Sequence, residues 1–348
     1  MSTLRRVLVV VAVLACGMVP AVAQGDDVDA RLAFRINDDR VTESSGLSVS
    51  RTRPGLAYTV NDSGDDARVL TVSMRTGAVV GETRLAGVEA VDVEAMAPAP
   101  GGRLVVGDIG DNGGDRESVE LYVIAEPGTG DADVEPRRVS LSYPGGPRDA
   151  EALLVAGRQV YVVTKSILGG QVLAAPVFAS RHDAYGLRAV ASAPSVVTDA
   201  ARLADGDVVM RDYDRGYVVD LPGWRVRRSY ALPRVEQGET MAAAPHGRRV
   251  YVGSEGSASP VFVLRVPQTA QRAQGQPQQS GTAGDQPTEP AQGQAQAQAQ
   301  REQDGDDDGL DRPRARPPGY IVAVAAVLVI GLLVRRYRRR RRGRRPPP

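Results

Sequence analysis

Two short sequence patterns recur in step five times along the chain, and this internal repeat constrains the fold more than any other feature. The first pattern has a mostly acidic centre, and its central residues are Ser45, Glu94, Glu151, Asp199 and Glu239, separated by 49, 57, 48 and 40 positions. The second is a short apolar run that ends at Asp62, Asp108, Lys165, Asp212 and Glu255. Repeats of roughly 40–50 residues are typical of the four-stranded blades of a β-propeller. Because the two patterns recur together, we predict an all-β propeller with five blades.

The rest of the folded region, residues 29–267, supports this interpretation. Its apolar residues come in short valine-rich runs that end at glycine or polar residues, as β-strands do. The last repeat has one strand-like run too few, so we expect the strand at residues 31–36 to complete the last blade and close the ring. The alternatives are a β-sandwich, which does not require an internal repeat, and a sixth blade if two units have been merged.

The N-terminus has the order of a cleavable signal peptide. Arg5 and Arg6 precede an apolar run at residues 7–15, and Ala21 and Ala23 supply an A-x-A cleavage site. We therefore expect residues 1–23 to be removed after export. Two alternatives are an N-terminal membrane span, for which the run is short, and lipidation of Cys16.

The C-terminus predicts a membrane anchor. Residues 268–318 are rich in Gln, Pro, Ala and Gly and are expected to form a disordered stalk, because they cannot bury enough apolar surface to fold. Residues 319–334 are expected to form one transmembrane helix, and residues 335–348 form an arginine-rich tail. The positive-inside rule places this tail in the cytoplasm and the propeller outside the cell membrane.

Charge and composition exclude several classes of function. The formal net charge is +1, but without nine tail arginines, Arg5 and Arg6 the remainder carries −10, which disfavours nucleic-acid binding and permits cations. Cys16 is the only cysteine, so the mature chain forms no disulfide and offers no thiol chemistry. With His182 and His246 as the only histidines, a zinc site and a Ser/His/Asp triad are not expected. We expect a monomer.

The repeat predicts two rings of polar side chains at one mouth of the propeller channel. Their oxygen ligands suit Ca²⁺ or Mg²⁺, and Asp92, Asp149 and Glu43 stand two residues before the central positions. The metal-ligand candidates are Glu94, Glu151, Asp199 and Glu239. The ligand-binding candidates are Asp62, Asp108, Asp111, Lys165, Asp212 and Glu255.

The same residues have a structural interpretation. Carboxylates at strand ends cap backbone N–H groups or pair with arginines such as Arg116, Arg148 and Arg211. Lys165, the only lysine, could contact a phosphate or carboxylate, or pair with Glu151 or Asp108.

Several of these segments resemble a known protein group. The matching segments are residues 43–47, 61–64, 92–96, 107–112, 143–144 and 149–153. They resemble exported, WD40-like propellers of the SdiA-regulated and phytase-like esterase group, of actinobacterial type. The resemblance implies a surface propeller with an acidic channel, and in the phytase-like relatives carboxylate-bound calcium holds a phosphate ester. Two functions follow as expectations: a surface module that binds a ligand or protein, with Ca²⁺ at its acidic mouth, or a calcium-dependent phosphoesterase or esterase.

Overall fold

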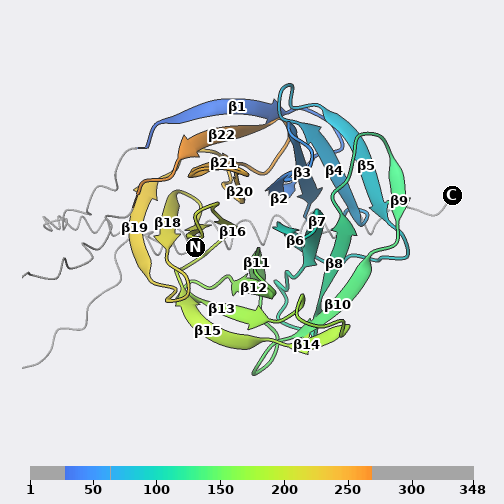
Figure 1. The fold of residues 1–348 in the computed structure, drawn as a ribbon, viewed down its shortest axis with the longest axis vertical. Helices are drawn as coiled ribbons and strands as arrows, with labels where there is room; N and C mark the ends of the chain where they lie inside the picture. Colours follow the sequence, from blue (N-terminus) through green and yellow to red (C-terminus); the bar gives the residue numbers. More distant parts are fainter. Residues whose placement is uncertain (1–27, 63, 269–348) are drawn as a thin grey trace, which may run out of the picture. The chain divides into compact units, whose positions relative to one another are not determined.

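The computed structural model of the protein describes residues 28–62 and 64–268, and every regular element in these residues is a β-strand. The strands form five sheets around a central axis (Figure 1), each with a four-stranded antiparallel core. The fold is a five-bladed β-propeller, as the repeat predicts, and the β-sandwich and the sixth blade are excluded.

The chain builds the blades in order. Blade 1 contains β2 (Ser44–Val49), β3 (Leu56–Asn61), β4 (Arg68–Ser73) and β5 (Val79–Leu85). Blade 2 contains β6 (Val93–Ala99), β7 (Arg103–Asp108), β8 (Val119–Ala125) and β10 (Arg137–Ser142). Blade 3 contains β11 (Ala150–Ala156), β12 (Gln159–Thr164), β13 (Gly170–Ala175) and β15 (Arg188–Ala193). Blade 4 contains β16 (Asp199–Arg202), β17 (Val208–Arg211), β18 (Arg215–Val219) and β19 (Val226–Ala231).

The fifth blade joins the two ends of the folded region. Its inner strands are β20 (Thr240–Ala243), β21 (Arg249–Gly253) and β22 (Ser259–Arg265), and its outer strand is β1 (Ala30–Ile36). β1 pairs antiparallel with β22 from Ala30 opposite Leu264 to Ile36 opposite Ser259. The predicted N-terminal clasp is therefore confirmed, and it covers the edge that β22 would otherwise expose.

Two short strands that the repeat does not predict link neighbouring blades. β9 (Ala132–Val134), which lies between two strands of blade 2, pairs in parallel with β5 of blade 1. β14 (Ala184–Gly186), which lies between two strands of blade 3, pairs in parallel with β10 of blade 2. Each connection thus reaches back to the preceding blade and covers its outer edge.

The hydrophobic core is a ring of five clusters, each shared between two adjacent blades. Tyr58 and Met96 lie in the cluster between blades 1 and 2, and Leu153 packs with Val105 between blades 2 and 3. The other three clusters lie between blades 3 and 4, blades 4 and 5, and blades 5 and 1. Because alternate side chains of a strand point to opposite faces of its sheet, both faces are buried here. This explains why the strands read as nearly continuous apolar runs.

The first strand of each blade lies nearest the axis. β2, β6, β11, β16 and β20 each contact the first strands of both neighbouring blades, and each forms the inner edge of its sheet (Figure 1). These five edges surround a central channel. All of them run in the same direction, so residues at the start of the strands gather at one mouth and residues at their ends gather at the other.

Residues 28–62 and 64–268 contain no helix that is long and apolar enough to cross a membrane. The predicted transmembrane segment, signal peptide, stalk, arginine-rich tail and Cys16 lie outside the described residues.

Candidate functional site

The two repeated patterns meet at one mouth of the channel because the first and second strands of each blade are antiparallel. Val93 at the start of β6 pairs with Asp108 at the end of β7, and Asp199 pairs with Arg211 in the same way in blade 4. We call this end of the channel the acidic mouth. It holds the predicted site residues Asp62, Glu94, Asp108, Asp111, Glu151, Lys165, Asp199, Asp212, Glu239 and Glu255.

Carboxylates from blades 1, 2 and 5 form the densest part of the acidic mouth. One oxygen each from Asp62, Asp92 and Glu94 lies within 4.8 Å of the others, and the same holds for Glu43, Asp62 and Glu255. Asp62 belongs to both groups. We call these five residues the carboxylate cluster. It unites two ligand-binding candidates, Asp62 and Glu255, with one metal candidate, Glu94, and adds Asp92 and Glu43 from the same sequence repeat.

Three of the five cluster residues are buried, whereas Glu43 and Glu255 are partly exposed. Asp62, Asp92 and Glu94 are 8 %, 6 % and 2 % exposed. Ser45, the non-acidic member of the first ring, donates its hydroxyl to Glu94 Oε2 at 2.8 Å. Burial raises the pKa of Glu94 well above its usual value, and the charges of Glu151, Asp62 and Asp92 raise it further. This shift favours the protonated form of the Glu94 carboxyl group over the charged form unless a cation lies beside it.

The spacing of the cluster suits a hard divalent cation. Calcium binds carboxylate oxygens at about 2.3–2.6 Å, so two oxygens on opposite sides of one ion lie about 5 Å apart. Three oxygens within 4.8 Å of one another can therefore share one ion. Each cluster residue supplies only oxygen ligands, which favours Ca²⁺ or Mg²⁺ over softer metals.

In blade 3 a lysine lies beside the buried glutamate of the first ring. Lys165 Nζ lies 2.8 Å from Glu151 Oε1, which is the ion pair that the sequence suggests, and it also lies 5.6 Å from the ring centre of Tyr213. Burial raises the pKa of Glu151 to about 8, although Lys165 opposes this shift. Burial lowers the pKa of Lys165, but the charge of Glu151 and its neighbours holds it well above the usual value. Lys165 therefore stays positively charged.

Two aspartates of the second ring act as caps. Asp108 accepts hydrogen bonds from the backbone N–H groups of Val91 and Asp92 at 3.0 and 2.9 Å, and its Oδ1 pairs with Arg116 at 2.8 Å. Asp212 accepts from the N–H groups of Asp214 and Arg215 and from the Tyr217 hydroxyl at 2.6 Å. These bonds occupy much of the acceptor capacity of both carboxylates and hold the loops of blades 2 and 4.

Three further candidates are also held by protein groups. Asp111 accepts two backbone N–H bonds, from Asp115 and Arg116, at 3.1 Å each. Asp199 accepts from Ala200 N–H at 2.7 Å and from Met241 N–H at 2.5 Å. Glu239 accepts a bond from the Gln237 side-chain amide at 2.8 Å. The capping alternative thus describes a large part of the acidic mouth.

Within the part of the chain that the structure describes, Arg211 forms no ion pair with a carboxylate, in contrast to the pairing that the sequence suggests, and it mainly joins two blades. Its buried guanidinium donates to the carbonyls of Thr240 and Gly253 in blade 5, at 2.9 and 3.2 Å, and to those of Asp212 and Tyr213. Burial lowers its pKa to about 10, so the group remains charged. Arg148 contacts the carbonyl of Pro144 at 3.5 Å.

Comparison with known proteins gives structural resemblances only. No family model and no curated protein sequence matches the chain. Among solved structures, Myxococcus xanthus glutaminyl cyclase matches at 13 % identity and a TM-score of 0.45, over 68 % of this chain and 97 % of that one. Kuenenia stuttgartiensis hydrazine synthase matches at 16 % identity and 0.38, over 64 % of this chain and 58 % of that one. A nidogen/laminin complex matches at 14 % and 0.40, over 62 % and 73 %. None of these matches assigns an activity to the chain.

Proposed function

We propose that this chain is a surface-displayed binding propeller whose carboxylate cluster holds a calcium ion at the acidic mouth. Asp62, Asp92 and Glu94 would supply the first ligands, and Glu43 and Glu255 would complete the site from the other side of Asp62. The ion would present open coordination positions at the channel mouth, where an oxygen-bearing ligand or partner protein outside the cell can bind. The proposal is for a binding module that requires no catalytic group.

The observation that carries this proposal is the burial of three carboxylates, each no more than 8 % exposed, with oxygens within 4.8 Å. Buried like charges repel one another strongly unless they share protons or bind a cation. In blade 3 the lysine at position 165 supplies that cation to Glu151, at 2.8 Å. At the carboxylate cluster, a calcium ion would play the same part.

The membrane location belongs to the same proposal and depends on the sequence pattern at the two ends of the chain. Cleavage after residue 23 and insertion of residues 319–334 would leave the propeller outside and the arginine tail inside. Protease treatment of intact cells tests this orientation. The propeller should be digested while an epitope tag on the C-terminus stays protected, and the reverse pattern would contradict the proposed topology.

Calcium titration of the full-length chain by calorimetry tests the site. We expect saturable binding, which Asp62→Asn should weaken most because Asp62 is shared by both groups of carboxylates. Loss of one charged ligand should cost at least about tenfold in affinity, or about 1.4 kcal/mol. Asp66→Asn is the matched control, since Asp66 is an exposed carboxylate four positions away.

Three outcomes would count against the proposal. Absence of heat at millimolar calcium would remove the metal site, and equal weakening by Asp66→Asn would show that the effect is non-specific. Calcium-dependent hydrolysis of p-nitrophenyl phosphate or p-nitrophenyl acetate, lost in Asp62→Asn, would replace the binding module by the phosphoesterase or esterase alternative.

A further inference from the structure

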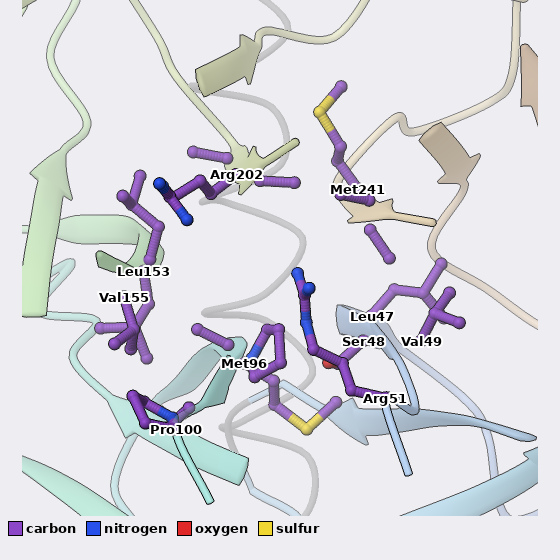
Figure 2. Close-up of a pocket in the computed structure, with 18 of the residues that line it drawn as sticks. Leu47, Ser48, Val49, Arg51, Met96, Pro100, Leu153, Val155, Arg202 and Met241 are labelled. Carbon is purple, nitrogen blue, oxygen red and sulfur yellow. The ribbon is translucent and has the colours of Figure 1, made fainter. Parts of the chain in front are cut away.

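The opposite mouth of the channel contains a cavity of about 220 Å³. Its wall is formed by all five first strands and by the turns that follow them (Figure 2). Its lining includes two arginines, Arg51 and Arg202, and no aspartate or glutamate. We call it the arginine cavity. It lies at the ends of the first strands, whereas the carboxylate cluster lies at their starts.

The wall presents backbone groups as well as side chains. Consecutive residues such as Ala97, Pro98 and Ala99 line the cavity because each first strand is the inner edge of its sheet. An edge strand leaves some N–H and C=O groups without partners from its own sheet. Backbone groups of the inner strand edges thus lie beside the two guanidinium groups, among side chains that are mostly small or aliphatic.

The two arginines approach the cavity from different blades. Figure 2 shows the Arg51 guanidinium projecting into the space between the first strands, with Arg202 on another side of it. Although the Arg51 side chain as a whole is exposed, the protein around its guanidinium removes part of its water, and this desolvation is the main reason that its pKa is lowered. The positive charge of Arg202 lowers it further. The two charges are therefore close enough to repel each other.

Neither guanidinium has an anionic partner within residues 28–62 and 64–268. Other arginines, including Arg68, Arg116 and Arg248, each lie within 3.3 Å of at least one carboxylate. The charge of Glu126 attracts Arg51, but its carboxylate bonds to the backbone N–H of Arg51, at 3.1 Å, and not to the guanidinium. Its carboxylate accepts bonds from the hydroxyls of Ser50 and Thr52, each at 2.6 Å, and from the Thr52 N–H.

We propose that the arginine cavity binds a small organic dianion, either a dicarboxylate or a phosphate monoester, through the guanidinium groups of Arg51 and Arg202. Two positive charges facing one space match two negative charges, and a guanidinium binds either carboxylate or phosphate through paired N–H groups. A volume of about 220 Å³ has room for a small dianion of this kind. This inference is independent of the calcium site.

Titration of the full-length chain with succinate and with methyl phosphate tests the proposal and distinguishes the two ligand chemistries. We expect saturable binding of at least one of them, in preference to acetate. Arg51→Gln and Arg202→Gln should each weaken it about 10- to 100-fold, the usual effect of losing one charge-assisted contact. Arg51→Lys should weaken binding less than Arg51→Gln, because lysine keeps the positive charge but lacks the paired N–H donors of a planar guanidinium group.

Arg188→Gln is the matched control, because Arg188 is an exposed arginine on the outer strand β15, away from the cavity. Both cavity arginines are exposed, so their variants should keep the wild-type unfolding temperature. Equal weakening by Arg188→Gln would show only non-specific charge attraction and overturn the proposal. Absence of binding by both dianions at about 10 mM, or acetate binding as tight as that of either dianion, would also overturn it.

Discussion

The raised pKa of Glu94 leads to a specific prediction about the proposed calcium site. Glu94 is 2 % exposed, and burial together with three neighbouring carboxylates raises its pKa well above the usual value. At pH 7 in the absence of calcium it should therefore carry a proton. A calcium ion that binds the Glu94 carboxylate must displace this proton, so binding should release close to one proton per ion. The apparent affinity should rise by up to about tenfold per pH unit below the pKa of Glu94.

The assay is calorimetry at pH 7 in Pipes, Mops and Tris, whose heats of protonation differ. The slope of the observed heat against the protonation heat gives the number of protons released. We expect a slope corresponding to about one proton for the native chain and a clearly smaller one for Glu94→Gln, which keeps the shape and removes the titrating group. A heat that does not depend on the buffer in the native chain would refute the reasoning, as would the same slope in the variant.

The raised pKa of Glu94 also predicts how the stability of the calcium-free protein depends on pH. The folded state holds the Glu94 proton at pH values where the unfolded chain, in which a glutamate has a pKa of 4.5, has lost it. Stability should therefore fall as pH rises, by at most about 1.4 kcal/mol per pH unit for this group. Chemical denaturation at pH 5 and 8 should show this loss, and saturating calcium should reduce it.

Three other substitutions test the fold and the mouth. Gly238→Ala should destabilise the propeller by about 1–3 kcal/mol, because a Cβ there would lie 2.0 Å from Arg211 Nη2; an unchanged denaturation midpoint would contradict this contact. Lys165→Gln should cost about 3–5 kcal/mol at pH 8 and less at pH 5, where Glu151 can take a proton; an equal loss at both pH values in denaturant titrations would argue against the ion pair. Ile36→Ala, in the clasp strand, should cost about 2–5 kcal/mol, and a loss under about 0.5 kcal/mol would show that β1 does not close the ring.

The fold could be predicted from the sequence because its repeat and its strand direction are linked. The central residue of each first pattern lies at or next to the start of the first strand of a blade. The charged residue that ends each second pattern lies at or just beyond the end of the second strand of the same blade. The last repeat lacks one strand, and in a closed ring the strand at residues 31–36 can fill this position. The clasp of β1 on β22 could therefore be predicted as well. β9 and β14 have three residues each and no repeat counterpart, so no periodic signal identifies them.

The candidate sites differ in how far the sequence could reveal them. The repeat identifies the residues of the acidic mouth, but it does not distinguish a capping residue such as Asp108 from a metal-ligand candidate such as Asp62. Residues outside the repeat contribute to this difference, for example Arg116, which pairs with Asp108. The arginine cavity left no periodic signal, because Arg51 and Arg202 occupy different positions within their repeats, six and three residues after Ser45 and Asp199.

The single lysine explains why the metal proposal is confined to one side of the acidic mouth. Glu94 and Glu151 occupy equivalent positions in blades 2 and 3, and burial raises the pKa of both carboxyl groups. Lys165 occupies the position that Asp108 has in blade 2, and its ammonium group lies 2.8 Å from Glu151. Asp108 instead pairs with Arg116 and accepts hydrogen bonds from two backbone N–H groups. Glu94 is left beside Asp62 and Asp92. Equivalent glutamates thus face a lysine in blade 3 and two neighbouring carboxylates in blade 2. We expect calcium to bind at Glu94 and not at Glu151.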